Sequence, residues 1–557
     1  MRQSNRTDLT RRRFLGTTLA SAMPAMLPVF AKDSDPLSPV DVASEPLLLI
    51  DDWLLSEQRG LTRTLHSPRK QGLIKEADGR DWERGDPFHG CIACRDSNGR
   101  FHLTFRYSWP DMSLKDHPSP SINRDKIHWF RFSIGYAYSD DGIHWTRPPL
   151  GLIEAPTGFR HQEEYPVWVP TGFSRENSLG CPIAFAYDLH AHGNSGDPEQ
   201  RFLVRVSRRD DTHYFAGYVE DNWYFAADWP DFAGDPQWRE KLTPITDGKA
   251  PPRGMMKLCG FDHEADEWFA VHQDFIGGWL PRNGRDIART ASPDLREWSR
   301  PQLVLPVAED ERKEPDDWVE YMDIDAYRVG GPQAGLWLGQ LLVFHSDRSD
   351  PLYQAPHIKS AWRKGLTELR LVSSRDAGRS WQPVCGKSVW LPCHDDPHGY
   401  DRLLFGQYPI RVGDESWLYY GCWDGDHMTL KADGSLLEPG VMRTGRTALA
   451  TLRWNGYVSL DAGPDGGSLT TRPLRFKGNR LTINADASGG RLVAAILDVD
   501  GHPIDRFGAE DCTPITSDAV RHEVKWRNAA DVSSLTGKTV RLRLEFDSAQ
   551  VYTFQFS

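Results

Sequence analysis

Residues 138–145, Tyr138-Ser139-Asp140-Asp141-Gly142-Ile143-His144-Trp145, join the end of a β-strand to a turn rich in Ser and Asp and then to a tryptophan. Two later stretches repeat this pattern, Ala291-Ser292-Pro293-Asp294-Leu295-Arg296-Glu297-Trp298 and Ser373-Ser374-Arg375-Asp376-Ala377-Gly378-Arg379-Ser380-Trp381. Tryptophans at positions 145, 223, 298, 381 and 454 recur at intervals of 73 to 83 residues. This period exceeds the ~40–50 residues of common propeller blades, but it accommodates four strands with long connections. The repeat therefore predicts an all-β fold that contains a five-bladed β-propeller.

The regular interval between these tryptophans could also arise by chance, because the chain contains 21 tryptophans. We reject chance spacing for the three copies that share the Ser and the Asp, and it stays open for Trp223 and Trp454. The copy Ser374-x-Asp376-x-Gly378-x-x-Trp381 resembles the Asp-box of sialidases, in which the carboxylate and the hydroxyl stabilise a turn. That resemblance implies a structural role for these aspartates. A sialidase would also need an arginine triad and usually six blades, whereas this repeat predicts five.

Alternating polar and apolar residues before the tryptophans predict the strands of each blade. Examples are Arg100–Tyr107, Glu320–Val329, Leu336–His345 and Glu368–Ser374. The apolar segment Leu47–Leu55 precedes the repeats. We expect it to add a strand to the last blade and so to close the ring.

The composition changes after Trp454, at the glycine- and aspartate-rich residues 461–467. Short alternating runs follow to the C-terminus, which is typical of a small β-sandwich. The sequence thus predicts three regions: a signal peptide over residues 1–31, a catalytic propeller over residues 32–457, and an accessory β-sandwich over residues 458–557.

The N-terminal residues carry an export signal. Thr10-Arg11-Arg12-Arg13-Phe14-Leu15-Gly16 matches the twin-arginine motif, and an apolar stretch of small residues follows it. Val29-Phe30-Ala31 suits a signal peptidase, so we expect cleavage after Ala31. The apolar stretch is shorter than the ~20 residues that span a bilayer, which argues against a retained anchor. We expect a periplasmic or secreted protein with no membrane contact after cleavage.

Charge and cysteine content exclude several classes of protein. The formal net charge of −12 argues against nucleic acid as a partner, because an acidic surface repels phosphate. Eight cysteines in 557 residues are too few for a disulfide framework. In Cys91-x-x-Cys94, residues three apart in a strand face opposite ways and cannot share a metal ion, so we favour buried thiols. No cofactor motif is found and none is expected, and the sequence does not specify an oligomeric state.

Acids and imidazoles are dense before the first strand of the first blade, in Asp81-Trp82-Glu83-Arg84-Gly85-Asp86-Pro87-Phe88-His89-Gly90. Asp86-Pro87-x-x-Gly90, residues 99–105, Trp109-Pro110 and the repeat ending at Trp145 follow the order found in five-bladed glycosidases. The chain thus resembles glycoside hydrolase families 32 and 43, as a divergent member. The resemblance implies that Asp86 is the nucleophile. The Arg-Asp-Pro and Glu-Cys motifs of those families are absent.

Glycoside cleavage needs a second carboxyl group, which protonates the leaving oxygen. The predicted first strand of the fourth blade opens with Val319-Glu320-Tyr321-Met322-Asp323-Ile324-Asp325. Glu320 and Asp323 are the candidates, and structural hydrogen bonds to loops are the alternative role. Strand alternation places Asp323 and Asp325 on one face and Glu320 on the other, unless a bulge intervenes.

Polar and aromatic residues at the remaining strand entrances are expected to bind sugar hydroxyls and ring faces. The candidates for substrate binding are His89, Arg253, Gln407, Trp423, Asp424 and His427, with His345 as a further one. Asp424 and Asp426 lack the additional oxygen ligands of a calcium loop, so no metal site is predicted.

These features predict an exported glycoside hydrolase that acts on a poly- or oligosaccharide through paired carboxylates in the propeller channel. The absent motifs keep a non-catalytic glycan-binding propeller open as an alternative. A glycoside phosphorylase, which needs a basic phosphate pocket, and a sialidase-like enzyme also stay open.

Overall fold

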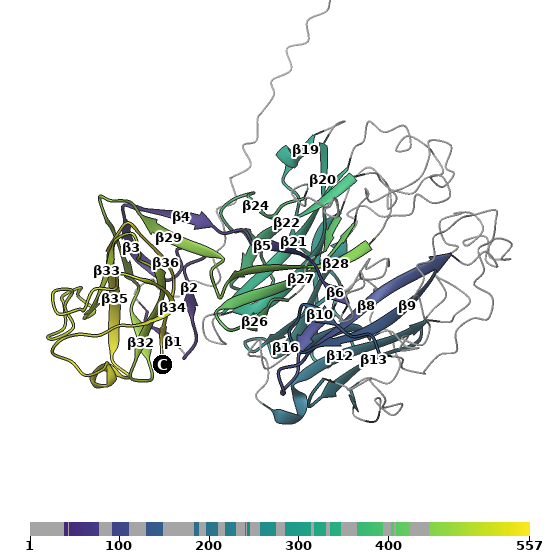
Figure 1. Cartoon of the computed structure of the whole chain (residues 1–557), viewed down its shortest axis with the longest axis horizontal. Coiled ribbons are helices and arrows are strands. Elements are labelled where there is room, and N and C mark those ends of the chain that lie inside the picture. The colour runs from purple at the N-terminus through teal and green to yellow at the C-terminus, as the bar shows by residue number, and fades with distance from the viewer. Residues whose placement is uncertain are drawn as a thin grey trace, which may run out of the picture.

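The computed structural model describes residues 38–42, 44–76, 92–110, 130–148, 183–188, 197–209, 218–229, 240, 242–245, 257–274, 285–313, 317–329, 335–346, 365–393, 403–405, 408–423 and 445–557. Over these residues the chain consists of β-strands, turns and short 3-10 segments, with no α-helix (Figure 1). The predicted all-β class is confirmed. Among the same residues, no helix has the length and apolar character needed to cross a membrane.

Five antiparallel sheets follow one another along the chain. The first contains β7 (Ile92–Arg95), β8 (Phe101–Pro110) and β9 (Phe130–Ser139), and beside it β10 (His144–Trp145) pairs with β6 (Lys75–Glu76). The second contains β11 (Ile183–Asp188), β12 (Phe202–Arg209), β13 (Tyr218–Ala226) and β14 (Thr243–Pro244). The third contains β15 (Lys257–Asp262), β16 (Glu267–Asp274), β17 (Asp286–Ser292) and β18 (Gln302–Leu305).

The fourth and fifth sheets are larger. The fourth contains β19 (Arg312–Lys313), β20 (Asp317–Val329), β21 (Leu336–Ser346), β22 (Gly365–Ser374), β23 (Gln382–Pro383) and β24 (Val389–Leu391). The fifth contains β25 (Leu403–Phe405), β26 (Ile410–Val412), β27 (Glu415–Trp423), β28 (Gly445–Arg453) and β5 (Arg69–Leu73). In each sheet, the long strands that follow one another in sequence pair as antiparallel hairpins.

The fifth sheet joins the end of this region to its beginning, because β5 pairs with β28 through Leu73 and Ala448. The prediction that Leu47–Leu55 supplies this strand is wrong. Leu47 and Leu48 form β2 (Leu47–Leu48), which pairs with β36 (Ala549–Phe556) near the C-terminus. The apolar residues of this segment divide between two cores: Leu47 packs with the C-terminal strands, and Leu48 packs with the fourth and fifth sheets.

Strands from both ends of the chain form a smaller lobe, at the left in Figure 1. One sheet contains β1 (Val40–Val42), β3 (Leu55–Arg59), β30 (Gly467–Thr471), β31 (Leu474–Phe476), β33 (Arg491–Leu497) and β35 (Thr539–Asp547). The other contains β2, β4 (Leu61–Leu65), β29 (Val458–Ala462), β32 (Leu481–Asp486), β34 (Asp518–Glu523) and β36. The strands of residues 40–65 therefore belong to the same sheets as those of residues 458–556.

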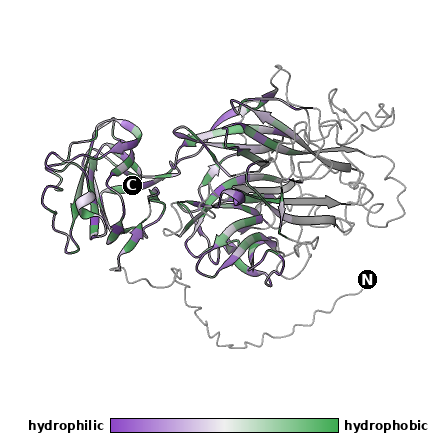
Figure 2. Ribbon diagram, turned by 90° about the horizontal axis from the view of Figure 1, so that it is seen from below, coloured by the Kyte–Doolittle hydropathy of each residue, from purple (hydrophilic) through white to green (hydrophobic). Residues whose placement is uncertain are grey.

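Strands of these sheets alternate buried and exposed side chains. Along β35 buried and less buried residues alternate over its whole length, as in a strand with one face on a core. Figure 2 shows hydrophobic and hydrophilic residues interspersed along the strands of both lobes. The core of the smaller lobe includes Phe476, Phe554 and Phe556, and the rings of Phe476 and Phe556 stack at 4.1 Å between centroids.

The three Ser/Asp/Trp repeats form turns between a third and a fourth strand. Asp141 Oδ1 accepts hydrogen bonds from the backbone N–H groups of Ile143 and His144, each at 2.8 Å. The indole Nε1 of Trp145 donates to the carbonyl oxygen of Gly142 at 3.1 Å, and the side chain is fully buried. Asp294 and Asp376 accept equivalent backbone hydrogen bonds in the two later copies. The structural role predicted for these aspartates is confirmed.

Candidate functional site

The structure describes only some of the predicted site residues. Glu320 and Asp323 are described with their side chains, and Trp423 is described as the last backbone position of β27. The remaining predicted residues lie outside the described residues; they are Asp86, His89, Arg253, Gln407, Asp424 and His427. The predicted catalytic acids with a described geometry are therefore those on β20.

A β-bulge brings the acids of β20 to one face. The pairing of β20 with β21 shifts by one residue between Tyr321 and Asp323, so that Met322 has no partner of its own. After the shift, the side chains of β20 again alternate between the two faces of the sheet, in register with those of β21. The acids pair in order with Phe344, Leu342 and Gln340, which are alternate residues of β21. Glu320, Asp323 and Asp325 therefore share a face, so Glu320 does not lie opposite them as strict alternation would require.

Lys257 binds two of these acids from the neighbouring sheet. It is the first residue of β15, and its Nζ lies 2.9 Å from Asp323 Oδ2 and 2.6 Å from Asp325 Oδ1. The backbone N–H of Ile324 donates to Asp323 Oδ1 at 2.9 Å. The two carboxylates hold the pKa of Lys257 above its ordinary value, although burial opposes this. The ammonium therefore stays charged between the two strands.

One ammonium cannot neutralise two buried carboxylates. Burial raises the pKa of Asp325 to about 6; Lys257 opposes this rise and the charge of Asp323 adds to it. Burial also raises the pKa of Asp323, against the effect of Lys257. The pair therefore takes up a proton at a higher pH than isolated aspartates do, and a proton donor needs this property.

Glu320 lies against the third sheet. Its side chain is 1% exposed, and Oε2 lies 3.6 Å from Nη1 of Arg285, which immediately precedes β17. Burial lowers the pKa of Arg285 to about 10. The backbone N–H of Tyr321 donates to the carbonyl oxygen of Arg285 at 3.1 Å, which fixes the start of β20 beside β17.

A second charged cluster continues from β20 toward β22. The hydroxyl of Tyr321 donates to Glu311 Oε2 at 3.0 Å, and Glu311 also pairs with Arg370. Arg370 Nε lies 3.0 Å from Glu368 Oε1, and His345 Nε2 lies 3.1 Å from the same oxygen. Although burial raises the pKa of Glu368, His345 and Arg370 hold it below its ordinary value. Glu368 is thus an ionised partner of Arg370 and His345 rather than a proton donor.

Tyrosines close the far end of β20. The ring of Tyr327 lies 6.2 Å from that of Tyr408 and 6.5 Å from that of Tyr457. Tyr408 donates from its hydroxyl to the carbonyl oxygen of Leu258 at 3.1 Å. Tyr327 is only 2% exposed. Since a strand rises ~3.3 Å per residue, these rings lie roughly 20 Å from Glu320, whereas Asp325 is only two residues from Tyr327.

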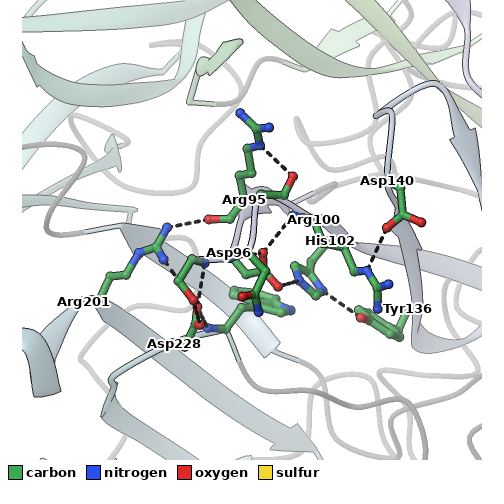
Figure 3. A network of polar contacts seen from close by, with 12 residues as sticks. Arg95, Asp96, Arg100, His102, Tyr136, Asp140, Arg201 and Asp228 are labelled. Atoms are coloured by element: carbon green, nitrogen blue, oxygen red, sulfur yellow. Dashed lines mark hydrogen bonds and ion pairs between the residues drawn. The ribbon is translucent and has the colours of Figure 1, made fainter. Parts of the chain in front are cut away.

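A further polar network surrounds the β7–β8 turn (Figure 3). His102 lies between Asp96 and Tyr136, with Nε2 at 3.2 Å from Asp96 Oδ2 and Nδ1 at 2.7 Å from the Tyr136 hydroxyl. Arg201 reaches across from the second sheet to the Arg95 carbonyl oxygen at 2.5 Å. His102 and Tyr136 are 4% and 1% exposed. This network joins the first two sheets.

The described residues contain no group of three or more His, Cys, Asp or Glu side chains placed to hold a metal ion. Cys94 is buried, as predicted, while Cys91 lies outside the described residues. Lys257 and Arg285 were missed by the sequence analysis. Each pairs with an acid far away in sequence, and only the packing of neighbouring sheets brings them together.

Comparison with known proteins gave matches among solved structures only. No protein-family model matches the chain, and no curated protein matches it. An N-acetylgalactosamine deacetylase from F. plautii, in complex with blood group B trisaccharide, is 14% identical over 71% of this chain and 96% of that chain, with a TM-score of 0.37. A β-1,2-mannobiose phosphorylase from Listeria innocua is 13% identical over 71% and 97%, with a TM-score of 0.34.

An α-L-arabinanase from Cellvibrio cellulosa is 10% identical over 67% of this chain and 92% of that chain, with a TM-score of 0.31. The expected resemblance to glycoside-hydrolase-like proteins is thus found among solved structures. At these TM-scores the likeness carries no argument about the activity of this chain.

Proposed function

We propose that the protein is an exported glycoside hydrolase in which the five consecutive sheets are the blades of a β-propeller. The closure of the fifth sheet by β5 supports the blade count, because a ring needs a strand from before its first blade. The two sheets that combine residues 40–65 with residues 458–556 support a β-sandwich as the accessory unit. The substrate is a poly- or oligosaccharide.

The shared face of Glu320, Asp323 and Asp325 carries the proposal. Glycoside cleavage needs one carboxyl group that holds a proton at the working pH and a second that is ionised. The raised pKa of Asp325, about 6, suits the proton donor, and Asp323 shares the same lysine. We assign the acid to this aspartate pair, with Glu320 beside it against Arg285. Asp86 remains the proposed nucleophile or base, on the strength of its motif alone.

The test is turnover of a panel of glycans by the mature chain and by three variants. Asp86→Asn and Asp323→Asn keep the size of each side chain but remove its ionisation, so we expect the turnover rate to fall by about a thousandfold or more. We also expect the free energy of unfolding of Asp86→Asn to equal that of the wild type. Asp505→Asn is the matched control, because Asp505 is 94% exposed on the smaller lobe. Wild-type rates in Asp86→Asn would refute the catalytic assignment.

The same assay separates hydrolysis from phosphorolysis and from binding alone. Lys257 and Arg285 supply positive charge beside the acids, as a phosphorylase would need, although both are paired with carboxylates. Product formation that depends on inorganic phosphate and yields a sugar phosphate would establish phosphorolysis. Glycan binding without turnover by the wild-type chain would establish a binding protein.

A further inference from the structure

A pocket of about 290 Å³ opens where the smaller lobe meets the fifth sheet. Its walls come from three parts of the chain: the segment between β4 and β5, the strands β27 and β28, and β36. The polar and aromatic side chains of its lining include His66, Arg69, Glu415, Thr451, Arg453 and Tyr552. β28 and β5 are the last two strands of the fifth sheet, whereas the acids lie on β20 of the fourth, so this pocket is separate from the proposed catalytic site.

One wall of the pocket is rigid. Arg453 donates to Asn484 Oδ1 and Asp518 Oδ1, both at 2.5 Å, and to the Ala485 carbonyl oxygen at 3.2 Å. Its guanidinium lies 4.8 Å from the ring centroid of Tyr552. These contacts tie β28 of the larger lobe to β32, β34 and β36 of the smaller one. The pocket is therefore formed before any ligand arrives.

The remaining lining groups offer both donors and acceptors. Arg69 is exposed, and Glu415 is half-buried, with Oε2 accepting from Trp417 Nε1 at 3.0 Å. Thr451 contributes a hydroxyl, which lies 2.8 Å from the Gln71 side chain. Burial lowers the pKa of His66, and the nearby Arg453 adds to this effect while Asp461 opposes it, so the imidazole is neutral near pH 7. Its Nε2 lies 2.6 Å from Ser459 Oγ.

This mixture selects a class of ligand. Arg453 is already paired with Asp518, so Arg69 and Glu415 offer one charge of each sign, and this balance favours neither an anion nor a cation. The polar lining disfavours an apolar molecule. Hydroxyl groups both donate and accept, so a neutral polyhydroxy ligand satisfies a guanidinium, a carboxylate and a hydroxyl at once. The volume lies at the lower end of the ~300–1,000 Å³ of small-molecule sites, which suits one or two sugar units.

We propose that this pocket binds a neutral sugar unit of a glycan, as a second carbohydrate site of the protein. Binding there requires no catalysis, so the proposal stands or falls independently of the hydrolase assignment. Its role is to hold a glycan on the protein at a distance from the acids of β20.

The experiment is saturation-transfer NMR on the mature chain with the methyl pyranosides of glucose, galactose, mannose, xylose and arabinose as probes. We expect binding of at least one glycoside. Arg69→Ala and Glu415→Gln should each weaken it about tenfold, because a hydrogen bond to a charged group contributes ~1.5–3 kcal/mol. Arg59→Ala is the matched control, because Arg59 is 77% exposed elsewhere on the smaller lobe and should have no effect.

Two results would overturn the proposal. The first is the absence of binding for every probe. The second is binding that persists in Arg69→Ala and Glu415→Gln but disappears in Asp86→Asn, which would place the sugar at the proposed catalytic site. Loss of turnover in Asp86→Asn with unchanged glycoside binding supports both proposals, and a chain that binds without any turnover refutes only the hydrolase.

Discussion

Lys257 shows at the level of single residues how two neighbouring sheets are held together. Its ammonium lies between Asp323 and Asp325, and it joins β15 of the third sheet to β20 of the fourth. Removing one partner of a buried ion pair leaves an uncompensated charge, which costs more than the pair itself contributes. The lysine is therefore needed as long as both aspartates are present.

Lys257→Met tests this requirement. Because both carboxylates would lose their cation, we expect the free energy of unfolding to fall by about 3 kcal/mol or more. Arg59→Met is the control: Arg59 pairs with Glu57 in solvent, so its loss should cost at most ~1 kcal/mol. Urea unfolding at pH 7 measures both. Equal costs for the two variants would show that the triad contributes no more than a surface pair.

Asp325 gives the stability a pH dependence of known sign. Its pKa in the folded protein is about 6, against an ordinary value of 3.8, so the folded state keeps a proton that the unfolded state has already released. The contribution of this group is therefore fully present below pH 3.8 and is lost as the pH rises to about 6. Asp325→Asn removes it. We expect the unfolding free energy of the wild type, relative to the variant, to decrease over this window.

Unfolding of both proteins at a series of pH values measures that difference. Asp505→Asn, in the exposed control position, should leave the pH profile of the wild type unchanged. Parallel profiles for the wild type and Asp325→Asn would mean that the aspartate titrates normally and is no candidate for the acid.

At the scale of elements, the Ser/Asp/Trp turns lock neighbouring sheets together. Gly142 has φ +75°, and its carbonyl oxygen accepts a hydrogen bond from the Tyr419 hydroxyl of β27 at 2.7 Å. A Cβ at this position would lie 2.6 Å from the Tyr419 hydroxyl oxygen and 2.7 Å from a ring carbon of Trp417. The turn therefore needs glycine for its conformation and for its packing on the fifth sheet.

Gly142→Ala should destabilise the protein for both reasons. We expect a loss of about 2–4 kcal/mol, made up of ~1–2 kcal/mol for the left-handed backbone and the rest for displaced aromatic rings. Gly413→Ala isolates the first contribution, because Gly413 has φ +61° and nothing within 4 Å of an added Cβ. Thermal unfolding compares the two. A loss no larger for Gly142→Ala than for Gly413→Ala would show that the fifth sheet tolerates the methyl group.

Elements with a regular pattern could be predicted from the sequence, and irregular ones could not. Alternation placed Glu320–Val329 and Leu336–His345 within a few residues of β20 and β21. The closing strand β5 was not predicted, because Arg-Lys-Gln-Gly-Leu is too polar to show the alternation of polar and apolar residues. The bulge at Met322 depends on pairing with β21, and no sequence pattern within β20 indicates it. It alone decides that Glu320 joins the face of Asp323, so neither this arrangement nor the contacts of Lys257 and Arg285 could be predicted from the sequence.

The whole molecule is organised so that its two ends fold together. Residues 40–65 supply strands to both sheets of the smaller lobe, whose remaining strands lie within residues 458–556. Arg375 in the fourth sheet also binds Asp51 in this segment, with two nitrogen–oxygen distances of 2.7 and 2.8 Å. Neither lobe's contacts can be completed until the C-terminal strands have been made. We propose that such a chain is exported after it has folded.

The twin-arginine motif at residues 10–16 predicts that route, because this export system carries folded proteins. Replacing Arg11, Arg12 and Arg13 by Lys keeps the charge but removes the guanidinium groups of the motif. We expect the variant to stay in the cytoplasm with residues 1–31 attached, while Arg6→Lys, outside the motif, is exported normally. Cell fractionation with mass measurement of the N-terminus distinguishes the two. Export of the triple variant, cleaved after Ala31, would show that the chain crosses the membrane by another route and that the assembly of its two ends takes place afterwards.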